Sequence, residues 1–144
     1  MDLLPVEDAI KELLELVRPV IGDERTPLDQ AYGRVSAEDV FAQIDVPSFN
    51  NSAMDGFAGC HEDLTEGLSY SVSDRIPAGR VGQTLTKNSL VRIFTGAPIP
   101  EGADSVIAQE DVEFSLDTAT IKKLPKKYSN VRKRGQDIPL GSRV

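Results

Sequence analysis

The first twenty residues carry a helical pattern of apolar and polar positions. Apolar side chains recur every three or four residues, which places them along one side of a helix with 3.6 residues per turn. The members of this stripe are Val6, Ile10, Leu13, Leu14 and Val17. Pro5 suits the first helical position, and Pro19 and Gly22 are expected to end the helix.

A second, shorter helix is predicted directly after this one. Thr26 is a typical N-cap residue, and Pro27 follows it at the first helical position. Gly33 suits the left-handed conformation that commonly ends a helix. The sequence therefore predicts two N-terminal helices.

From Arg34 onward, apolar residues alternate with polar ones or form short clusters, with glycine and proline between them. This pattern predicts short strands in a small sandwich or barrel rather than repeated βαβ units. The clusters are Val40–Ile44, Leu68–Val72, Leu90–Phe94, Ser105–Ala108, Val112–Phe114 and Ala119–Leu124. The expected fold class is α+β and predominantly β.

The composition limits the number of domains and argues against several kinds of binding site. A chain of 144 residues can form one domain with a real core, or two small ones. Its 23 acidic and 16 basic residues give a net charge of −7, which disfavours non-specific binding to nucleic acid. A single cysteine, Cys60, cannot form an intrachain disulfide, and a single histidine, His61, cannot build a histidine-rich metal site. We treat this adjacent pair as structural or incidental, because neighbouring side chains usually point apart.

The apolar runs are too short to span a membrane, and the N-terminus lacks the basic region of a signal peptide. We therefore expect a soluble cytoplasmic protein with no membrane partner.

Charge is distributed unevenly along the second half of the chain. Residues 93–121 contain six acidic and no basic residues, whereas residues 122–134 contain only basic charges. These are Lys122, Lys123, Lys126, Lys127, Arg132, Lys133 and Arg134. This basic segment has three possible interpretations. It is a strand edge protected by lysines, a site for a phosphorylated small molecule, or a patch that binds nucleic acid. The last reading is the weakest, because Tyr128 is the only aromatic residue in the segment.

Three segments are richer in glycine and small polar residues than a core requires. Residues 47–58 present oxygens and amides but also contain common turn formers. In residues 92–104 a strand runs into Thr95 and Gly96, where a ligand could approach the backbone closely. In residues 130–138 cations and a carboxylate flank a glycine, which suits a phosphate with Mg²⁺ or a turn with a surface ion pair. None of them matches a Walker loop or a dinucleotide-binding glycine motif.

Together and in this order, the three segments resemble the N-terminal part of molybdopterin molybdenumtransferase, the bacterial counterpart of the gephyrin E domain. The resemblance rests on the stretches Asn51–Ala58, Arg92–Asp104 and Asn130–Ile138. Residues 28–40 also resemble the family's entry into an elongated domain. The resemblance covers nearly the whole chain.

The resemblance implies an activity and an architecture. The family inserts molybdenum from molybdate into adenylylated molybdopterin, with release of AMP, and requires a divalent cation such as Mg²⁺. Its members are homodimers whose active cleft lies between the β-rich domain of one subunit and the cofactor-binding domain of the other. For this chain it implies helices and the elongated domain at 1–40, a barrel-like mixed β domain at 41–141, and a return into the elongated domain at 142–144.

The resemblance also implies site residues. Asp55, Thr95 and Asp137 are the expected catalytic residues, with Asp55 and Asp137 as metal ligands whose individual roles could be exchanged. Ser52 and Arg134 are expected to bind substrate.

The chain departs from the family at three positions: Asn50 stands where Asp is usual, Phe57 where Tyr is frequent, and Gln136 where Glu is frequent. The change at Gln136 removes a potential charge beside Asp137 and is expected to weaken a cation site.

Family chains continue well beyond the equivalent of Val144. We therefore expect this polypeptide to need the cofactor-binding domain, in cis or in trans, and to be inactive alone. The apolar stripe of the first helix then lacks its partner, so self-association or a helix disordered in solution is expected. The alternative functions are a non-catalytic dimerisation or scaffold module of the same fold and, less favoured, an RNA binder.

Overall fold

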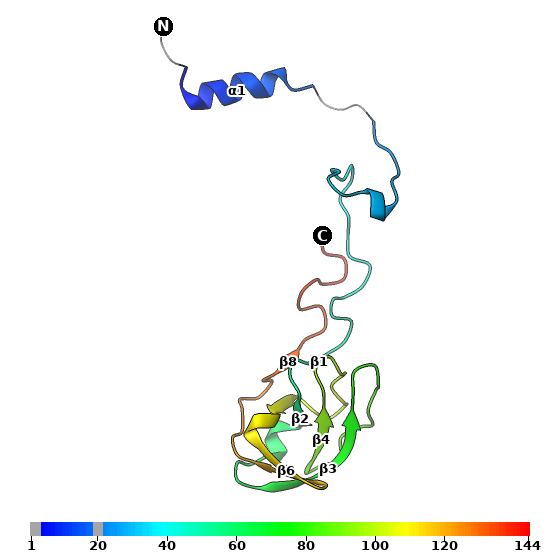
Figure 1. The fold of residues 1–144 in the computed structure, drawn as a ribbon, viewed down its shortest axis with the longest axis vertical. Coiled ribbons are helices and arrows are strands. Elements are labelled where there is room, and N and C mark those ends of the chain that lie inside the picture. Colours follow the sequence, from blue (N-terminus) through cyan, green and yellow to red (C-terminus); the bar gives the residue numbers. More distant parts are fainter. Residues whose placement is uncertain (1–3, 19–21) are drawn as a thin grey trace. The chain divides into compact units, whose positions relative to one another are not determined.

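The computed structural model describes residues 4–18 and 22–144 (Figure 1). It divides into two compact units, Met1–Glu38 and Asp39–Val144. The second unit holds all of the strands and both core clusters.

The N-terminal unit contains the predicted first helix, α1, at Val6–Leu16. Pro5 caps the helix with an extended backbone (ψ 148°), one position before its predicted place. Val17 is likewise extended and ends the helix, whereas Pro19 lies outside the described residues. No residue of α1 is buried, so the apolar stripe is exposed within this unit; Leu13, for example, is 64% exposed.

The prediction of a second helix is wrong. The chain forms only a single 3-10 turn, η1, at Leu28–Gln30, and Thr26 makes no capping hydrogen bond because Pro27 is the cap. No residue of η1 is buried, so no packing extends a turn that is too short to be stable by itself. Gly33 does adopt the expected positive φ, 76°. No helix in the described part of the chain is long and apolar enough to cross a membrane.

The second unit is a curled β structure. Its elements are β1 (Asn51–Ser52), β2 (Gly56–Gly59), η2 (His61–Asp63), β3 (Ser69–Ile76), β4 (Ser89–Ile93), β5 (Ser105–Ala108), η3 (Gln109–Asp111), β6 (Val112–Ser115), β7 (Thr118–Ile121) and β8 (Val131–Arg132). Six strands form one sheet in the order β5-β2-β4-β3-β7-β6, and β1 pairs with β8. Only β3 and β4 run parallel within the sheet, so it is mixed, as expected (Figure 1).

Five of the six predicted apolar clusters coincide with strands β3 to β7. The sixth, Val40–Ile44, contributes only an isolated bridge between Phe41 and Arg143. The pattern missed β2, the strand between β4 and β5, because two of its four residues are glycine and the segment looks like a turn.

Side chains from both faces of the sheet are buried. Alternation along β2 and β4 sends Phe57 and Leu90 into one cluster and Ala58 and Val91 into the other. The first cluster is Phe57, Leu64, Tyr70, Leu90, Ile107, Val112, Ala119 and Ile121. The second is Ala58, Ile76, Val91, Ile93, Ala97 and Val106. The strands that carry the candidate site are therefore packed into this core.

Asp104, immediately before β5, ties three parts of this unit together. Its Oδ1 accepts hydrogen bonds from the His61 backbone N–H (2.9 Å) and the Ser105 hydroxyl (2.9 Å). Its Oδ2 lies 3.5 Å from Lys127 Nζ. Burial raises the pKa of Asp104, but these hydrogen bonds and the Lys127 charge outweigh burial and hold the pKa below its ordinary value of 3.8.

We expect Asp104→Ala to lower the free energy of unfolding by about 2 kcal/mol at neutral pH, because it leaves charged and polar donors without their acceptor. The folded-state pKa of Asp104 lies below its unfolded value, so this contribution is present above the unfolded pKa and disappears as the pH falls through the folded pKa. Urea denaturation at a series of pH values measures it, with the exposed Glu113→Ala on β6 as control. A difference from wild type that does not shrink below about pH 3.8 contradicts the assignment.

Candidate functional site

Asp55 and Thr95 meet at the end of two adjacent strands. Asp55 directly precedes β2, and Thr95 follows shortly after β4, whose Ile93 pairs with Gly56. Asp55 Oδ1 accepts hydrogen bonds from the backbone N–H of Thr95 (2.8 Å) and from its hydroxyl (2.7 Å). Two of the three predicted catalytic residues are therefore in direct contact.

The Asp55 carboxyl is held in its ionised form. The backbone hydrogen bond from Thr95 lowers its pKa most, followed by the Thr95 hydroxyl, and the charge of Arg92 lowers it further. Within residues 4–18 and 22–144, the hydrogen bonds to this side chain all use Oδ1. The second oxygen, Oδ2, therefore remains able to accept from a ligand or bind a cation.

Ser52 shapes the turn that leads to Asp55. Its side chain is buried, and its hydroxyl donates to the carbonyl of Met54 (2.5 Å). Its backbone carbonyl accepts from Gly96 N–H (2.8 Å), and its N–H donates to the carbonyl of Ala97 (2.9 Å). These contacts join the turn before β2 to the loop after β4 and so support the Asp55–Thr95 pair.

The third motif, residues 130–138, packs along residues 45–52 through the pairing of β8 with β1. Arg134 donates through Nε to Asp45 Oδ2 (2.6 Å), and its backbone N–H donates to Asn50 Oδ1 (2.8 Å). The backbone N–H of Leu140 and the Arg134 guanidinium hold the pKa of Asp45 below its ordinary value. Arg134 therefore links the loop of residues 130–138 to residues 45–50.

Two amide side chains have structural uses in this segment. Asn50 accepts from Arg134, as described above, and Gln136 Oε1 accepts from the backbone N–H of Lys133 (2.9 Å). Both amide side chains close the turn that contains Gly135.

Asp137, the third predicted catalytic residue, lies on a different segment from Asp55. Its carboxylate forms an ion pair with Arg132, and its backbone N–H donates to the carbonyl oxygen of Val46. Val46 lies before β1 in the chain, whereas Asp55 lies after β1. Across the described ranges no hydrogen bond joins Asp137 to Asp55 or Thr95, and no group of three or more His, Cys, Asp or Glu side chains could hold a metal ion. A cation at either carboxylate would therefore need oxygens from a substrate, water or another chain.

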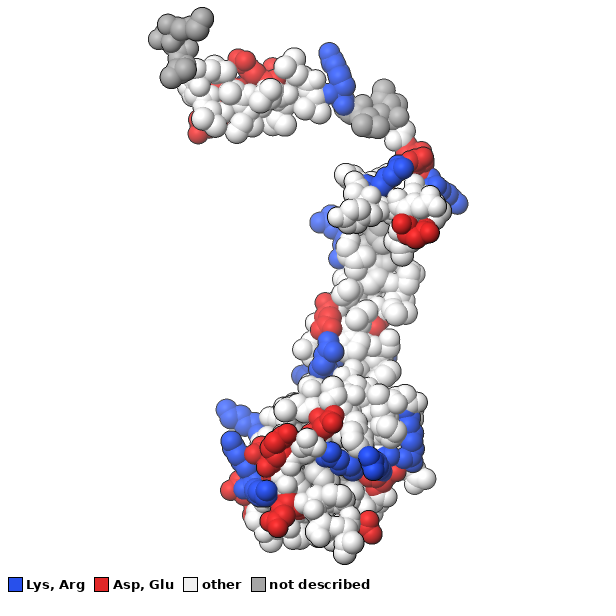
Figure 2. Space-filling model, viewed as in Figure 1, with Lys and Arg blue, Asp and Glu red and all other residues white. Residues whose placement is uncertain are grey.

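Three of the seven basic residues in 122–134 form ion pairs with acids of this unit. Lys127 pairs with Glu62 (2.7 Å), which raises its pKa, and lies near Asp104, while Arg132 and Arg134 have the partners described above. Figure 2 shows basic and acidic side chains interspersed over the visible face of the β-rich unit. The mixture weakens the nucleic-acid reading of residues 122–134.

The sequence analysis did not identify Arg92 as a site residue. In the structure, the charge of Arg92 lowers the pKa of Asp55. Arg92 lies on β4 directly opposite Phe57 of β2, and its guanidinium donates to Gly56 O (3.2 Å) and Gln109 Oε1 (2.6 Å). A signal was present: Arg92 is the one charged residue in the apolar run Leu90–Phe94.

Comparison with known proteins identifies the family. Residues 4–144 match the family model described as "MoeA N-terminal region (domain I and II)". The chain belongs to the MoeA family. It is 42% identical, over 99% of its length, to molybdopterin molybdenumtransferase of Haemophilus influenzae, and 38% identical over 98% to that of Staphylococcus epidermidis. The chain spans 36% and 35% of these two proteins, so it corresponds to the N-terminal portion of MoeA.

The fold is that of MoeA as well. A crystal structure of the molybdopterin biosynthesis MoeA protein from Pyrococcus horikoshii superposes on 99% of this chain with a TM-score of 0.85 and 32% sequence identity. The chain covers 39% of that structure. The family resemblance inferred from the three motifs is confirmed.

Proposed function

We propose that this MoeA N-terminal region supplies Asp55, Thr95 and Asp137 to a site where molybdenum from molybdate is inserted into adenylylated molybdopterin, with release of AMP. The observation that carries the proposal is the Asp55–Thr95 pair. This carboxylate is ionised, is fixed by two hydrogen bonds at the end of two core strands, and has one oxygen without a hydrogen bond among the described residues. It is therefore suited to chemistry rather than to packing.

The residues fit a hard divalent cation shared with substrate. Mg²⁺ commonly takes one or two protein carboxylates and completes its shell with water and phosphate oxygens. Asp55 would bind it through Oδ2, and Asp137 would bind from the neighbouring segment; the two roles can be exchanged. When bound, the cation would neutralise phosphate charge on the substrate. Thr95 keeps the Asp55 carboxylate oriented and ionised.

Ser52 and Arg134 contribute differently from the initial expectation. Because the Ser52 hydroxyl bonds inside its turn and Arg134 pairs with Asp45, we assign both to the positioning of the loops that carry Asp55 and Asp137.

The proposed assembly is a cytoplasmic homodimer in which a cofactor-binding domain completes each site. That domain acts in cis or in trans and faces the β-rich unit of the other subunit. These 144 residues supply one side of the cleft and form no cofactor alone.

A graft tests the proposal. The matching N-terminal portion of the Haemophilus influenzae relative is replaced by this chain, and cofactor formation is measured from adenylylated molybdopterin, molybdate and Mg²⁺. We expect activity from the graft and none from the isolated chain. Turnover by the isolated chain, or a correctly folded graft without activity, contradicts the proposal.

A further inference from the structure

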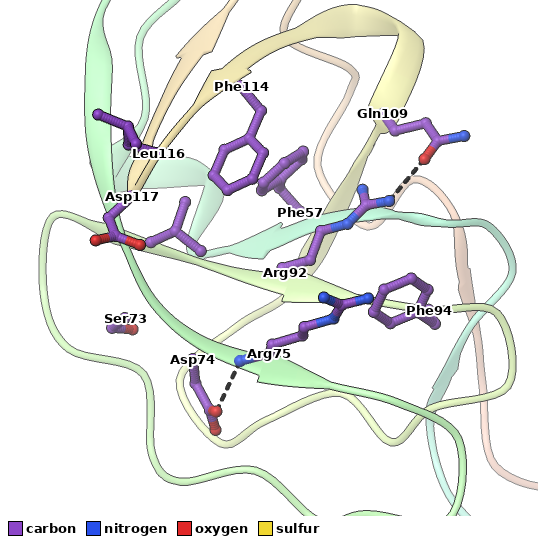
Figure 3. Close-up of a pocket in the computed structure, with 11 residues that line it drawn as sticks. Phe57, Ser73, Asp74, Arg75, Arg92, Phe94, Gln109, Phe114, Leu116 and Asp117 are labelled. Atoms are coloured by element: carbon purple, nitrogen blue, oxygen red, sulfur yellow. Dashed lines mark hydrogen bonds between the residues drawn. The ribbon is translucent and has the colours of Figure 1, made fainter.

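Arg92 lies on β4, in the wall of a groove of about 750 Å³ on the β-rich unit (Figure 3). It is half-buried between the buried residues Val91 and Ile93 of the same strand. Among the described residues, no salt bridge within 4.0 Å includes Arg92. A half-buried cation without a carboxylate partner costs folding free energy, so packing alone would favour an apolar residue here. Exceptions of this kind are expected where a residue serves a functional site.

Two aromatic rings hold the Arg92 guanidinium. Its Cζ lies 4.9 Å from the centre of the Phe57 ring and 4.9 Å from the centre of the Phe94 ring. Phe57 lies two residues after Asp55, and Phe94 directly precedes Thr95. The rings therefore come from the two segments that carry the Asp55–Thr95 pair. Cation–π contacts hold a guanidinium against a ring face, so the N–H donors of Arg92 have a fixed direction.

The oriented guanidinium connects β2 to η3. Its Nη1 donates to the carbonyl oxygen of Gly56 (3.2 Å), and its Nη2 donates to Gln109 Oε1 (2.6 Å), the bond drawn in Figure 3. Gln109 in turn donates through its backbone N–H to the carbonyl oxygen of Asp55 (3.1 Å). Arg92 and Gln109 therefore hold two successive carbonyl groups of the chain, those of Asp55 and Gly56. We call this pair the Arg92–Gln109 clamp.

The clamp acts on a part of Asp55 that Thr95 does not touch. Thr95 donates both of its hydrogen bonds to the Asp55 carboxylate, whereas the clamp holds the backbone from which that side chain projects. Asp55 precedes β2 and takes no part in the ladders that β2 forms with β4 and β5. Strand pairing by itself therefore leaves the backbone of Asp55 less constrained than that of β2, and the clamp supplies the missing constraint.

We propose that Arg92, together with Gln109, is a positioning residue that fixes the backbone of Asp55 for the reaction. The inference rests on the proposed function, because Arg92 acts only through Asp55 and itself contacts neither substrate nor cation. Without the clamp, Asp55 would keep its hydrogen bonds to Thr95 but could shift with its backbone. A misplacement of about 1 Å can cost about a hundredfold in rate.

Steady-state kinetics of the grafted enzyme test the proposal. Arg92→Met keeps an unbranched chain between the two rings but removes the N–H donors. We expect kcat for cofactor formation to fall about tenfold while KM for adenylylated molybdopterin changes by less than about twofold, because Arg92 does not bind the substrate. Gln109→Leu, at an exposed position, removes the acceptor but keeps the backbone N–H, and should lower kcat about fivefold.

A double-mutant cycle with Asp55→Asn separates positioning from a merely structural role. In the Asp55→Asn background, Arg92→Met should change kcat by less than about twofold, because the residue through which it acts is already impaired. The matched control is Arg75→Met on β3, which should retain wild-type kcat. Arg75 pairs in register with Arg92, and its Cζ lies 4.9 Å from the same Phe94 ring. In the described part of the chain, its guanidinium makes no hydrogen bond to β2 or η3.

The outcomes distinguish this inference from the proposed function. Three results overturn the positioning role alone: wild-type kcat in both clamp variants, an undiminished effect of Arg92→Met in the Asp55→Asn background, or a rise in KM of about tenfold, which would make Arg92 a substrate-binding residue. Wild-type kcat in Asp55→Asn itself overturns the proposed function, and the positioning role with it. Thermal melting checks that each variant is folded, and Gln109→Leu takes the place of Arg92→Met in the cycle if the latter does not fold.

Discussion

Gly56→Ala is expected to prevent the β-rich unit from folding. A Cβ at this position would overlap the backbone carbonyl oxygen of Ile107 and lie 3.0 Å from Val106 Cγ1. Because β2 pairs with β4 on one side and β5 on the other, it cannot move away from β5 without breaking a ladder. We expect a loss above about 4 kcal/mol, which approaches the whole stability of a small domain.

Gly59, at the other end of β2, provides a matched comparison. An alanine Cβ there would meet the side-chain ends of Leu90 (2.7 Å) and Leu64 (2.8 Å), which can shift, rather than backbone. Gly59→Ala should therefore cost only about 1–3 kcal/mol. Ser71→Ala, at an exposed position on β3, is the neutral control. Denaturant unfolding followed by circular dichroism measures all three, and a Gly56→Ala protein as stable as Gly59→Ala refutes the prediction.

Asp55→Asn is expected to reduce cofactor formation in the grafted enzyme by about a hundredfold or more, a loss typical of removing a charged group that acts in the reaction. Asparagine retains an oxygen that can accept from the Thr95 N–H and hydroxyl, so the strand ends should keep their arrangement. The negative charge that would bind a cation is lost. Thr95→Val keeps the backbone hydrogen bond and removes one hydroxyl, so its loss should be nearer to tenfold.

The matched control for Asp55→Asn is Glu113→Gln, the same carboxylate-to-amide change at an exposed position on β6. Thermal melting of each variant separates loss of activity from loss of fold. Full activity of a folded Asp55→Asn enzyme would remove Asp55 from the site and favour the non-catalytic dimerisation or scaffold function instead.

Local sequence patterns were sufficient for much of this molecule. The 3.6-residue stripe located α1, and short apolar clusters located β3 to β7, because periodicity reports which face of an element is apolar. The order and spacing of three glycine-bordered motifs identified the MoeA family. The prediction of a second helix was wrong because Thr26 and Pro27 indicate only where a helix could begin. Packing is needed to extend a short turn into a helix, and η1 has no buried residue.

Other features depended on contacts between residues distant in the sequence. The strand β2, the hydrogen bonds between Asp55 and Thr95, the ion pair between Arg134 and Asp45, and the groove around Arg92 all depend on how distant segments pair. The sequence supplied the residue types for these sites. Their partners were decided by long-range packing and strand pairing, which a local pattern does not encode.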